Sequence, residues 1–395
     1  PAVDIFDNPP QEGSMYWNTT GTPRFKVWTS GVWIYPPDMA LGTASLADIG
    51  TAADQVPTNA DLDGKNLLIN GDFAINVREH SGAVTTSGMY TADMLKCFLN
   101  IPVGDTLDIT IPPNGPVDID ITKTTYRATA TFTSSDATNT GIFMGQPVEN
   151  AERFLSGETV TLGCWVWSDT VRQITTEAIV DYGIGGSPSV RGLGNKIDLV
   201  AGWQKITSTY VVPTLTTETL GVDGNILQSI WLTAGSANDS STDSLGLQPN
   251  GTISTTAWKL EEGSVSTRFS TQGASTGEEL ALCQRVAWKP DVGTTFADYG
   301  SSRWVSTTGM RTTIKPPVTM RRTPDLSIIG VLSGFVVDYS GGGLTPTAIS
   351  LDPSIFGADG GAMDITVAAG GIPGETSALL NSNNTTNGLL FTAGI

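Results

Sequence analysis

The chain has 395 residues, of which only 15% are charged, and it contains 45 glycines and 22 prolines. Long solvent-exposed helices need more charged residues than this, and glycine and proline mark turns, so the composition favours an all-β fold. The net charge of −18 opposes binding to nucleic acid or to an anionic membrane surface, because both depend on clustered Lys and Arg.

Residues 1–37 contain three short β-like runs separated by Asn, Gly and Pro turn signals. This pattern predicts a three-stranded meander. A meander of this size cannot bury Trp17, Trp28 and Trp33 by itself, so we expect these side chains to contact another subunit or a partner protein. Residues 38–63 show no clear periodicity and are predicted to be a linker.

Residues 64–270 carry a sustained strand pattern that is typical of a β-sandwich. Turn signals separate the predicted strands, which cover 124–133, 159–168, 174–181, 203–212, 226–234 and 253–261. Strict alternation in the first of them places Tyr126, Ala128, Ala130 and Phe132 on one face.

The strand at 159–168 places two tryptophans on the face opposite its aliphatic residues. Val160, Leu162, Cys164 and Val166 share the aliphatic face, whereas Trp165 and Trp167 share the other. Two interpretations remain for the tryptophans. They fill a second core layer or a subunit interface, or they form a platform on which sugar rings stack. Trp203, Trp231 and Trp258 are predicted to be core residues.

Residues 271–395 form a third predicted unit, which begins with a helix at 276–288. Thr276 precedes Glu279 by three residues, the spacing of a capping box. Strand-like pieces follow at 303–314, 326–337 and 346–351, and residues 331–395 contain no Lys or Arg. This composition predicts a β-rich C-terminal tip domain.

The sequence offers little material for catalysis or metal binding. His80 is the only histidine, and the three cysteines, at 97, 164 and 283, lie far apart, so no catalytic residue, metal ligand or cofactor is predicted. A pair of carboxylates could still make a glycosidase. The longest apolar run, 326–337, is shorter than the roughly 20 residues of a membrane span, and no signal peptide is visible, so we expect no membrane insertion.

Two stretches resemble the tail-fibre and minor structural proteins of tailed bacteriophages. Segment 66–73 (NLLINGDF) resembles a common opening of these proteins. Segments 258–264 (WKLEEGS) and 277–285 (GEELALCQR), with Arg268 and Phe269 between them, resemble their hinge. The N-terminal piece from Gly13 to Trp33 is similar to a small β module of phage structural proteins.

The middle segment also resembles the jelly-roll carbohydrate-binding modules that are attached to xylanases and glucanases. The elements that match are the opening at 70–73, the strand at 157–166, the turn at 202–205 and the closing residues 260–261. Those modules often hold a structural calcium partly through an Asp, and Thr256 stands at the similar position here. The resemblance implies a sandwich that binds carbohydrate.

These resemblances imply a non-enzymatic fibre protein of a phage virion, located on the tail. The N-terminal meander would attach to other virion proteins, and the chain would form a homotrimer, as is usual for such fibres. Trp165 and Trp167 are the candidate residues for contact with host surface polysaccharide or lipopolysaccharide. The alternatives are a purely structural head-fibre or decoration protein and a depolymerising tailspike, although no β-helix repeat period is visible.

Overall fold

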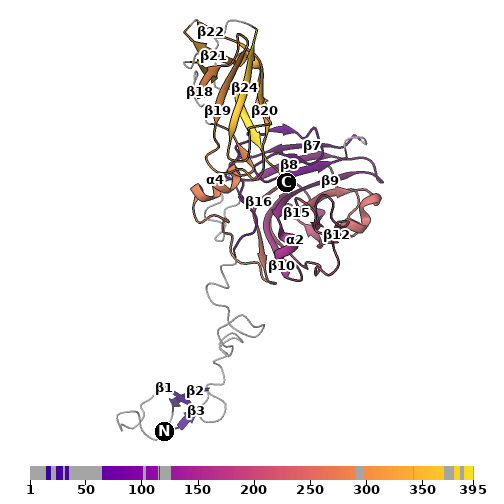
Figure 1. Ribbon diagram of the computed structural model, residues 1–395. Coiled ribbons are helices and arrows are strands. Elements are labelled where there is room, and N and C mark those ends of the chain that lie inside the picture. Colours follow the sequence, from indigo (N-terminus) through magenta and orange to yellow (C-terminus); the bar gives the residue numbers. More distant parts are fainter. Residues whose placement is uncertain are drawn as a thin grey trace, which may run out of the picture. The chain divides into compact units, whose positions relative to one another are not determined.

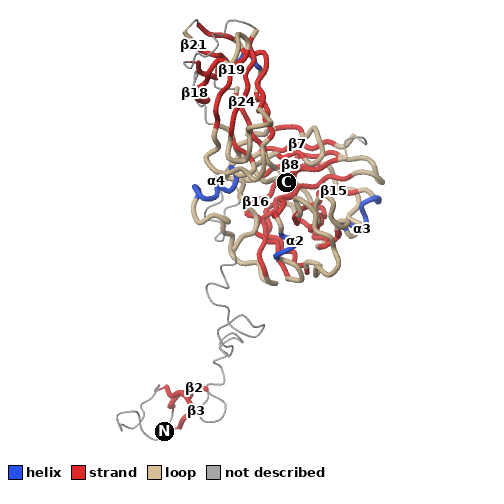
Figure 2. The backbone as a smooth tube through the Cα atoms, in the orientation of Figure 1, coloured by secondary structure: helices blue, strands red, loops and turns tan. Residues whose placement is uncertain are grey.

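The computed structural model describes residues 15–18, 24–29, 32–34, 65–100, 104–113, 115, 126–290, 298–340, 342–368, 378–382 and 387–394, the first three ranges by their backbone alone. Strands dominate these residues and helices are few and short, which confirms the all-β fold class (Figure 2). The chain divides into two compact units, Pro1–Asp63 and Gly64–Ile395. Each unit is described by itself below.

The first unit contains the predicted meander. Strands β1 (Met15–Asn18), β2 (Arg24–Thr29) and β3 (Val32–Ile34) form an antiparallel sheet in the order β1-β2-β3. Its register places Trp28 opposite Trp33, and Trp17 opposite Phe25. The side chains of these strands and the predicted linker at 38–63 lie outside the residues that the structure describes.

One sheet of the sandwich has six strands in the order β14-β10-β16-β8-β7-β4. They are β4 (Gly82–Ala83), β7 (Thr106–Thr110), β8 (Ala128–Thr133), β10 (Thr159–Ser168), β14 (Gly202–Val211) and β16 (Gly251–Glu262). The strands that the sequence predicts around 124–133, 159–168, 203–212 and 253–261 all fall in this sheet.

The second sheet has the order β12-β11-β15-β9-β6-β5, and β13 pairs with β11. Its strands are β5 (Met89–Tyr90), β6 (Lys96–Leu99), β9 (Gly141–Glu149), β11 (Arg172–Asp181), β12 (Val190–Leu193), β13 (Lys196–Leu199) and β15 (Asn225–Ala234). Short helical turns α2 (Ala151–Phe154), η3 (Ser236–Asn238) and α3 (Asp239–Thr242) lie in its connections. From β8 to β11 the chain alternates between the two sheets, as in a jelly roll (Figure 1).

Both sheets contribute to the hydrophobic core of the sandwich. The alternation predicted for β10 is confirmed, because Val160, Leu162, Cys164 and Val166 are all at most 1% exposed within this core. Trp258 is fully buried there, as predicted. The prediction for Trp203 is wrong. This residue is half-buried on the outer face of the six-stranded sheet, directly opposite Trp167.

The segment at 66–73 closes the sandwich against β16. Asn66 is completely buried, and its side-chain amide donates to the carbonyls of Trp258 and Ser270, both at 2.9 Å. Gly71 passes so close to β16 that a Cβ atom there would lie 2.1 Å from the Trp258 carbonyl oxygen. The motif therefore has a structural role, because its small and amide residues let two backbones meet and satisfy their hydrogen-bonding groups.

A buried carboxylate lies beneath this closing segment. Asp93 is 1% exposed, accepts a hydrogen bond from the Val77 amide at 2.5 Å, and its Oδ1 lies 3.5 Å from Nε of Arg78. Burial raises the pKa of Asp93 from 3.8 to about 6, although the Val77 amide and Arg78 act in the opposite direction. The Asp93 carboxyl group therefore binds a proton more tightly in the folded protein than in the unfolded chain.

We expect this carboxylate to make the protein less stable as the pH rises. A pKa that folding raises contributes stability below the unfolded value, and that contribution is lost as the pH passes through the folded value, here between about pH 4 and 6. The corresponding change in the free energy of unfolding is about 3 kcal/mol at most. Urea unfolding at pH 4.5 and pH 7 measures it, with Asp93→Asn as the comparison. Equal pH dependence in both proteins would contradict the assignment.

The strands after residue 286 form two further sheets around a second core. The smaller has the order β17-β26-β20 and the larger the order β22-β21-β25-β18-β19-β24-β23 (orange to yellow in Figure 1). Their bounds are β17 (Ala287–Trp288), β18 (Asp298–Trp304), β19 (Gly309–Ile314), β20 (Asp325–Ile329), β21 (Phe335–Tyr339), β22 (Gly342–Leu344), β23 (Pro346–Leu351), β24 (Gly361–Val367), β25 (Ala378–Ser382) and β26 (Gly388–Thr392). The two cores lie on either side of the predicted boundary at residue 270, and the division into domains stays a prediction.

The helix at this boundary is shorter than predicted and begins with a different cap. Helix α4 spans Thr276–Gln284, and its N-cap is Ser275, whose hydroxyl accepts from the Glu278 amide at 3.2 Å. Glu279 does not complete a capping box, because its carboxylate accepts from the amides of Asn70 and Gly273 instead. The helix is thereby tied to the closing segment.

The predicted piece at 326–337 is two strands, β20 and β21. Gly330 adopts a positive φ of 83°, and the 3₁₀ turn η4 (Leu332–Gly334) follows it, so the strand cannot continue. The piece at 346–351 coincides with β23.

Candidate functional site

Three aromatic rings form a strip across the outer face of the seven-stranded sheet. Phe98 on β6 lies opposite Phe143 on β9, which lies opposite Trp231 on β15. The Phe98 and Phe143 rings stack with their centroids 4.4 Å apart, and those of Phe143 and Trp231 are 4.2 Å apart. Residues directly opposite each other on neighbouring strands share a face, so the strip follows from the strand register.

A buried carboxylate holds the end of this strip. Glu177 on β11 is completely buried and accepts a 2.6 Å hydrogen bond from Nε1 of Trp231. The same carboxylate accepts from the guanidinium of Arg191 at 3.2 and 3.1 Å and from the Gly192 amide at 3.1 Å. The Arg191 guanidinium lies 5.9 Å from the centre of the Trp231 ring, and its side chain is 41% exposed. Glu177 therefore holds the Trp231 indole in place and positions the Arg191 guanidinium beside it.

The strip forms the floor of a groove made of two adjoining hollows. One has a volume of about 360 Å³, and the other has about 570 Å³. They share Phe98, Phe143 and Arg191. Carboxamides of Asn100, Asn139 and Asn238 line the first, and Asp181 and Asn225 line the second. Apolar rings with a few polar groups around them, in a volume of several hundred cubic ångströms, are typical of a small-molecule site.

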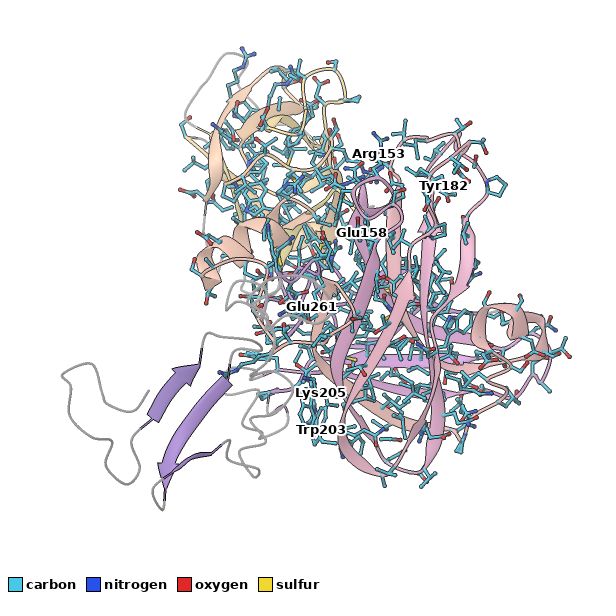
Figure 3. The ribbon with its side chains drawn as sticks, turned by 90° about the horizontal axis from the view of Figure 1, so that it is seen from below. Arg153, Glu158, Tyr182, Trp203, Lys205 and Glu261 are labelled. Carbon is cyan, nitrogen blue, oxygen red and sulfur yellow. The ribbon has the colours of Figure 1, made fainter. Side chains whose placement is uncertain are left out.

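The sequence-predicted residues Trp165 and Trp167 lie on the other sheet. Both are half-buried on its outer face, where Trp165 is opposite Lys205 and Trp167 is opposite Trp203. Trp203 and Lys205 follow one another along β14 (Figure 3). The cavity beside Trp165 has a volume of about 10 Å³, which holds one water at most. The structure thus places the predicted pair on the outer face of the other sheet, away from the groove.

Sequence reasoning missed the groove because its rings lie in strands with weak patterns. Gly141, Gly145 and Pro147 interrupt the alternation around Phe143, so β9 was not predicted. Trp231 is buried, as predicted. It is 1% exposed, but it packs in a separate small cluster with Phe143 on the outer face. The available signal was the pair of aromatic residues at 98 and 143, which lie in short apolar runs.

The predicted N-terminal contact residues Trp17, Trp28 and Trp33 lie in strands β1, β2 and β3. Their side chains are not among those described, so their predicted contact with a subunit or virion protein stays a prediction. His80 is half-buried, and its Nε2 lies 3.1 Å from the Gly82 carbonyl oxygen. The Thr256 hydroxyl, at the position that resembles a calcium ligand, donates to the Tyr126 carbonyl at 2.8 Å.

The described residues contain neither a candidate metal cluster nor a membrane-spanning helix. Within the described residues, no group of three or more His, Cys, Asp or Glu side chains is placed to hold a metal ion. No helix in the described part of the chain has the length and apolar character that crossing a membrane requires.

Comparison with known proteins gives matches among solved structures alone. No family model matches the chain, and no curated protein matches it. A family 4 carbohydrate-binding module is 17% identical with a TM-score of 0.30, covering 50% of this chain and 99% of its own. The family 11 module of a cellulosomal cellulase of Clostridium thermocellum is 11% identical with a TM-score of 0.27, covering 46% and 95%.

A third similar structure is the enzymatically active domain of tailspike protein 4 of bacteriophage CBA120. It is 12% identical with a TM-score of 0.27, and the match covers 50% of this chain and 21% of that one. At these identities and scores, the assignment of the all-β sandwich rests on the sheets observed in this chain.

Proposed function

We propose that the sandwich binds a glycan in the groove on the outer face of the seven-stranded sheet. The observation that carries this proposal is the strip of Phe98, Phe143 and Trp231 at the floor of the groove. Phe98 and Phe143 are half-buried and offer apolar ring surface to the apolar face of a sugar, whereas Trp231 is 1% exposed and packs against Phe143. Arg191 and the surrounding carboxamides offer hydrogen bonds to hydroxyl groups. This site replaces Trp165 and Trp167 as the candidate contact with a host glycan.

The wider role that we propose is that of a fibre protein on a phage virion, which binds host polysaccharide or lipopolysaccharide and does not cleave it. The resemblance of segments 66–73 and 258–285 to phage fibre proteins supports this role. We also propose a homotrimer, in which the meander of residues 1–37 attaches to other virion proteins. Light scattering of the purified chain tests the trimer, and mass spectrometry of separated heads and tails tests the location.

Removing the central ring of the strip is expected to weaken glycan binding about tenfold. Phe143 lies between Phe98 and Trp231, so Phe143→Ala interrupts the stacked surface where a sugar would lie. The measurement is binding of the full chain to a panel of bacterial capsular polysaccharides and lipopolysaccharides. Analysis of the same mixtures for released oligosaccharides tests whether the chain also cleaves them.

The matched control is the double variant Trp165→Ala/Trp167→Ala, which removes two rings from the opposite sheet. We expect it to bind as the unchanged protein does. Loss of binding in this double variant with retention in Phe143→Ala would return the site to the tryptophans and overturn the assignment of the groove. Both proteins must first show unchanged far-ultraviolet circular dichroism.

A further inference from the structure

A hollow of about 450 Å³ adjoins the groove and is lined by three cationic residues and the single histidine. Arg78, His80 and Lys96 come from the sandwich, and Arg322 comes from the segment just before β20. The whole chain has only 21 Lys and Arg and one His, against 39 Asp and Glu. The presence of three of these cations and the histidine around one hollow is therefore contrary to the composition of the chain.

Carboxylates lie beside two of the cations, and one of these carboxylates, that of Asp325, also lines the hollow. Asp93 lies beneath Arg78, with 3.5 Å between Oδ1 and Nε. Asp325 lies 4.0 Å from Arg322, but its side chain is 83% exposed and that of Arg322 is 50% exposed. A pair this exposed interacts weakly in water and leaves the guanidinium able to contact a ligand. The overall charge of −18 acts at longer range, where salt screens it beyond about 8 Å.

The Arg78 side chain is buried and retains a hydrogen-bond donor that a ligand could contact. Its side chain is 8% exposed, and its guanidinium lies over the Tyr90 ring at 4.6 Å. Nη2 of Arg78 has no hydrogen-bond acceptor within the described part of the chain, and Nε lies 3.5 Å from Oδ1 of Asp93. Burial lowers the pKa of Arg78, and the charge of Asp93 opposes this change. A buried guanidinium with an unused donor is costly unless an acceptor reaches it.

Lys96 and Arg322 connect this hollow with the groove, because both line the hollow and also the larger part of the groove. Lys96 precedes Phe98 by two residues on β6, and its Nζ lies 6.0 Å from the centre of the Phe98 ring and 5.2 Å from that of Tyr90. A ligand stacked on Phe98 would therefore present its next substituent to these cations.

We propose that the cationic hollow, defined by Arg78, His80, Lys96 and Arg322, binds an anionic group of the glycan, a carboxylate or a phosphate. The chain then selects acidic polysaccharides over neutral ones. This inference rests on the proposed function for the choice of a glycan as the carrier of the anion. The hollow itself can be tested without the groove.

The first experiment compares one bound polysaccharide before and after removal of its charge. Carbodiimide activation with borohydride reduction converts uronic acids to neutral sugars, and aqueous hydrofluoric acid removes phosphate esters. We expect the full chain to bind the native polymer at least tenfold more tightly than one of the two treated forms, and which form loses affinity identifies the anion. Equal binding of all three forms overturns the proposal while leaving the groove as a glycan site.

The second experiment removes one cation at a time. Arg322→Gln is the main variant, because its exposed side chain carries little risk to folding. Lys96→Gln is the second. We expect each to weaken binding of the acidic polymer about tenfold and to weaken binding of its neutral form less, since the neutral form carries no anion for the lost cation to contact. Lys205→Gln, at an exposed position on the opposite sheet, changes the net charge equally and should have no effect.

A direct titration separates failure of this inference from failure of the proposed function. D-glucuronate and inorganic phosphate, with D-glucose as the neutral match, are added to the full chain at millimolar concentrations and followed by nuclear magnetic resonance. Binding of one anion that Arg322→Gln weakens supports the hollow even if no polysaccharide in the panel binds. Absence of anion binding, or equal binding by the variant, overturns it.

Discussion

Replacing Asn66 by alanine is expected to lower the free energy of unfolding by about 4 kcal/mol or more. The side chain makes four hydrogen bonds in a fully buried position. Its amide donates to the Trp258 and Ser270 carbonyls, and its oxygen accepts from the amides of Leu68 at 3.0 Å and Leu260 at 3.1 Å. Alanine removes all four bonds and leaves buried backbone groups without partners, which costs more than the bonds themselves.

Urea unfolding followed by tryptophan fluorescence measures this loss. The matched control is Asn250→Ala, since Asn250 is exposed and its carboxamide oxygen accepts from the Ser134 amide at 2.8 Å. We expect the control to lose about 1 kcal/mol or less. Comparable losses at the two positions would show that Asn66 does not fasten the closing segment to β16.

Lys259→Met is expected to destabilise the chain by about 3–5 kcal/mol, because it leaves Glu261 as a buried charge without its partner. The two side chains are 2% and 1% exposed, with 3.2 Å between Nζ and Oε2. Nζ of Lys259 also donates to the Thr267 hydroxyl at 2.5 Å and the Arg268 carbonyl at 2.9 Å. Glu261 accepts from the Thr267 amide at 2.7 Å. The pair thus holds the segment after β16 against the sheet.

The double variant Lys259→Met/Glu261→Gln should recover part of that loss, because glutamine keeps an acceptor for Thr267 and carries no charge. Lys289→Met serves as the control. It makes the same change in a more exposed pair, in which Nζ of Lys289 lies 2.6 Å from Oε2 of Glu79 and the side chains are 19% and 65% exposed, and should cost less than about 1 kcal/mol. A double variant less stable than Lys259→Met would rule out the buried charge as the cause.

The contacts of Asn66 and of the Lys259–Glu261 pair explain why the motifs at 66–73 and 258–264 lie together in the fold. Asn66 joins the start of the sandwich to its last strand, and the Lys259–Glu261 pair fixes the chain that leaves that strand. Gly163 on β10 permits this path, since a Cβ atom there would lie 2.1 Å from the hydroxyl of Ser266. The segment after β16 therefore lies against the middle of β10.

The sequence by itself determined the fold class and most strands of the six-stranded sheet. Strict alternation identified β8 and β10, because a strand with one buried face must place apolar residues at every second position. The same rule placed Trp165 and Trp167 opposite the core face, as the structure shows. The alternation rule could not determine whether that outer face carries a groove.

The tertiary structure alone decided where the groove lies. Phe98, Phe143 and Trp231 come from strands far apart in the sequence, and their contact depends on the register between β6, β9 and β15. A β-bulge between Trp231 and Thr233 shifts that register, so the apolar run in β15 does not reveal which face the indole takes. Alternation describes one strand, whereas a binding surface is a property of neighbouring strands, and only their pairing brings its residues together.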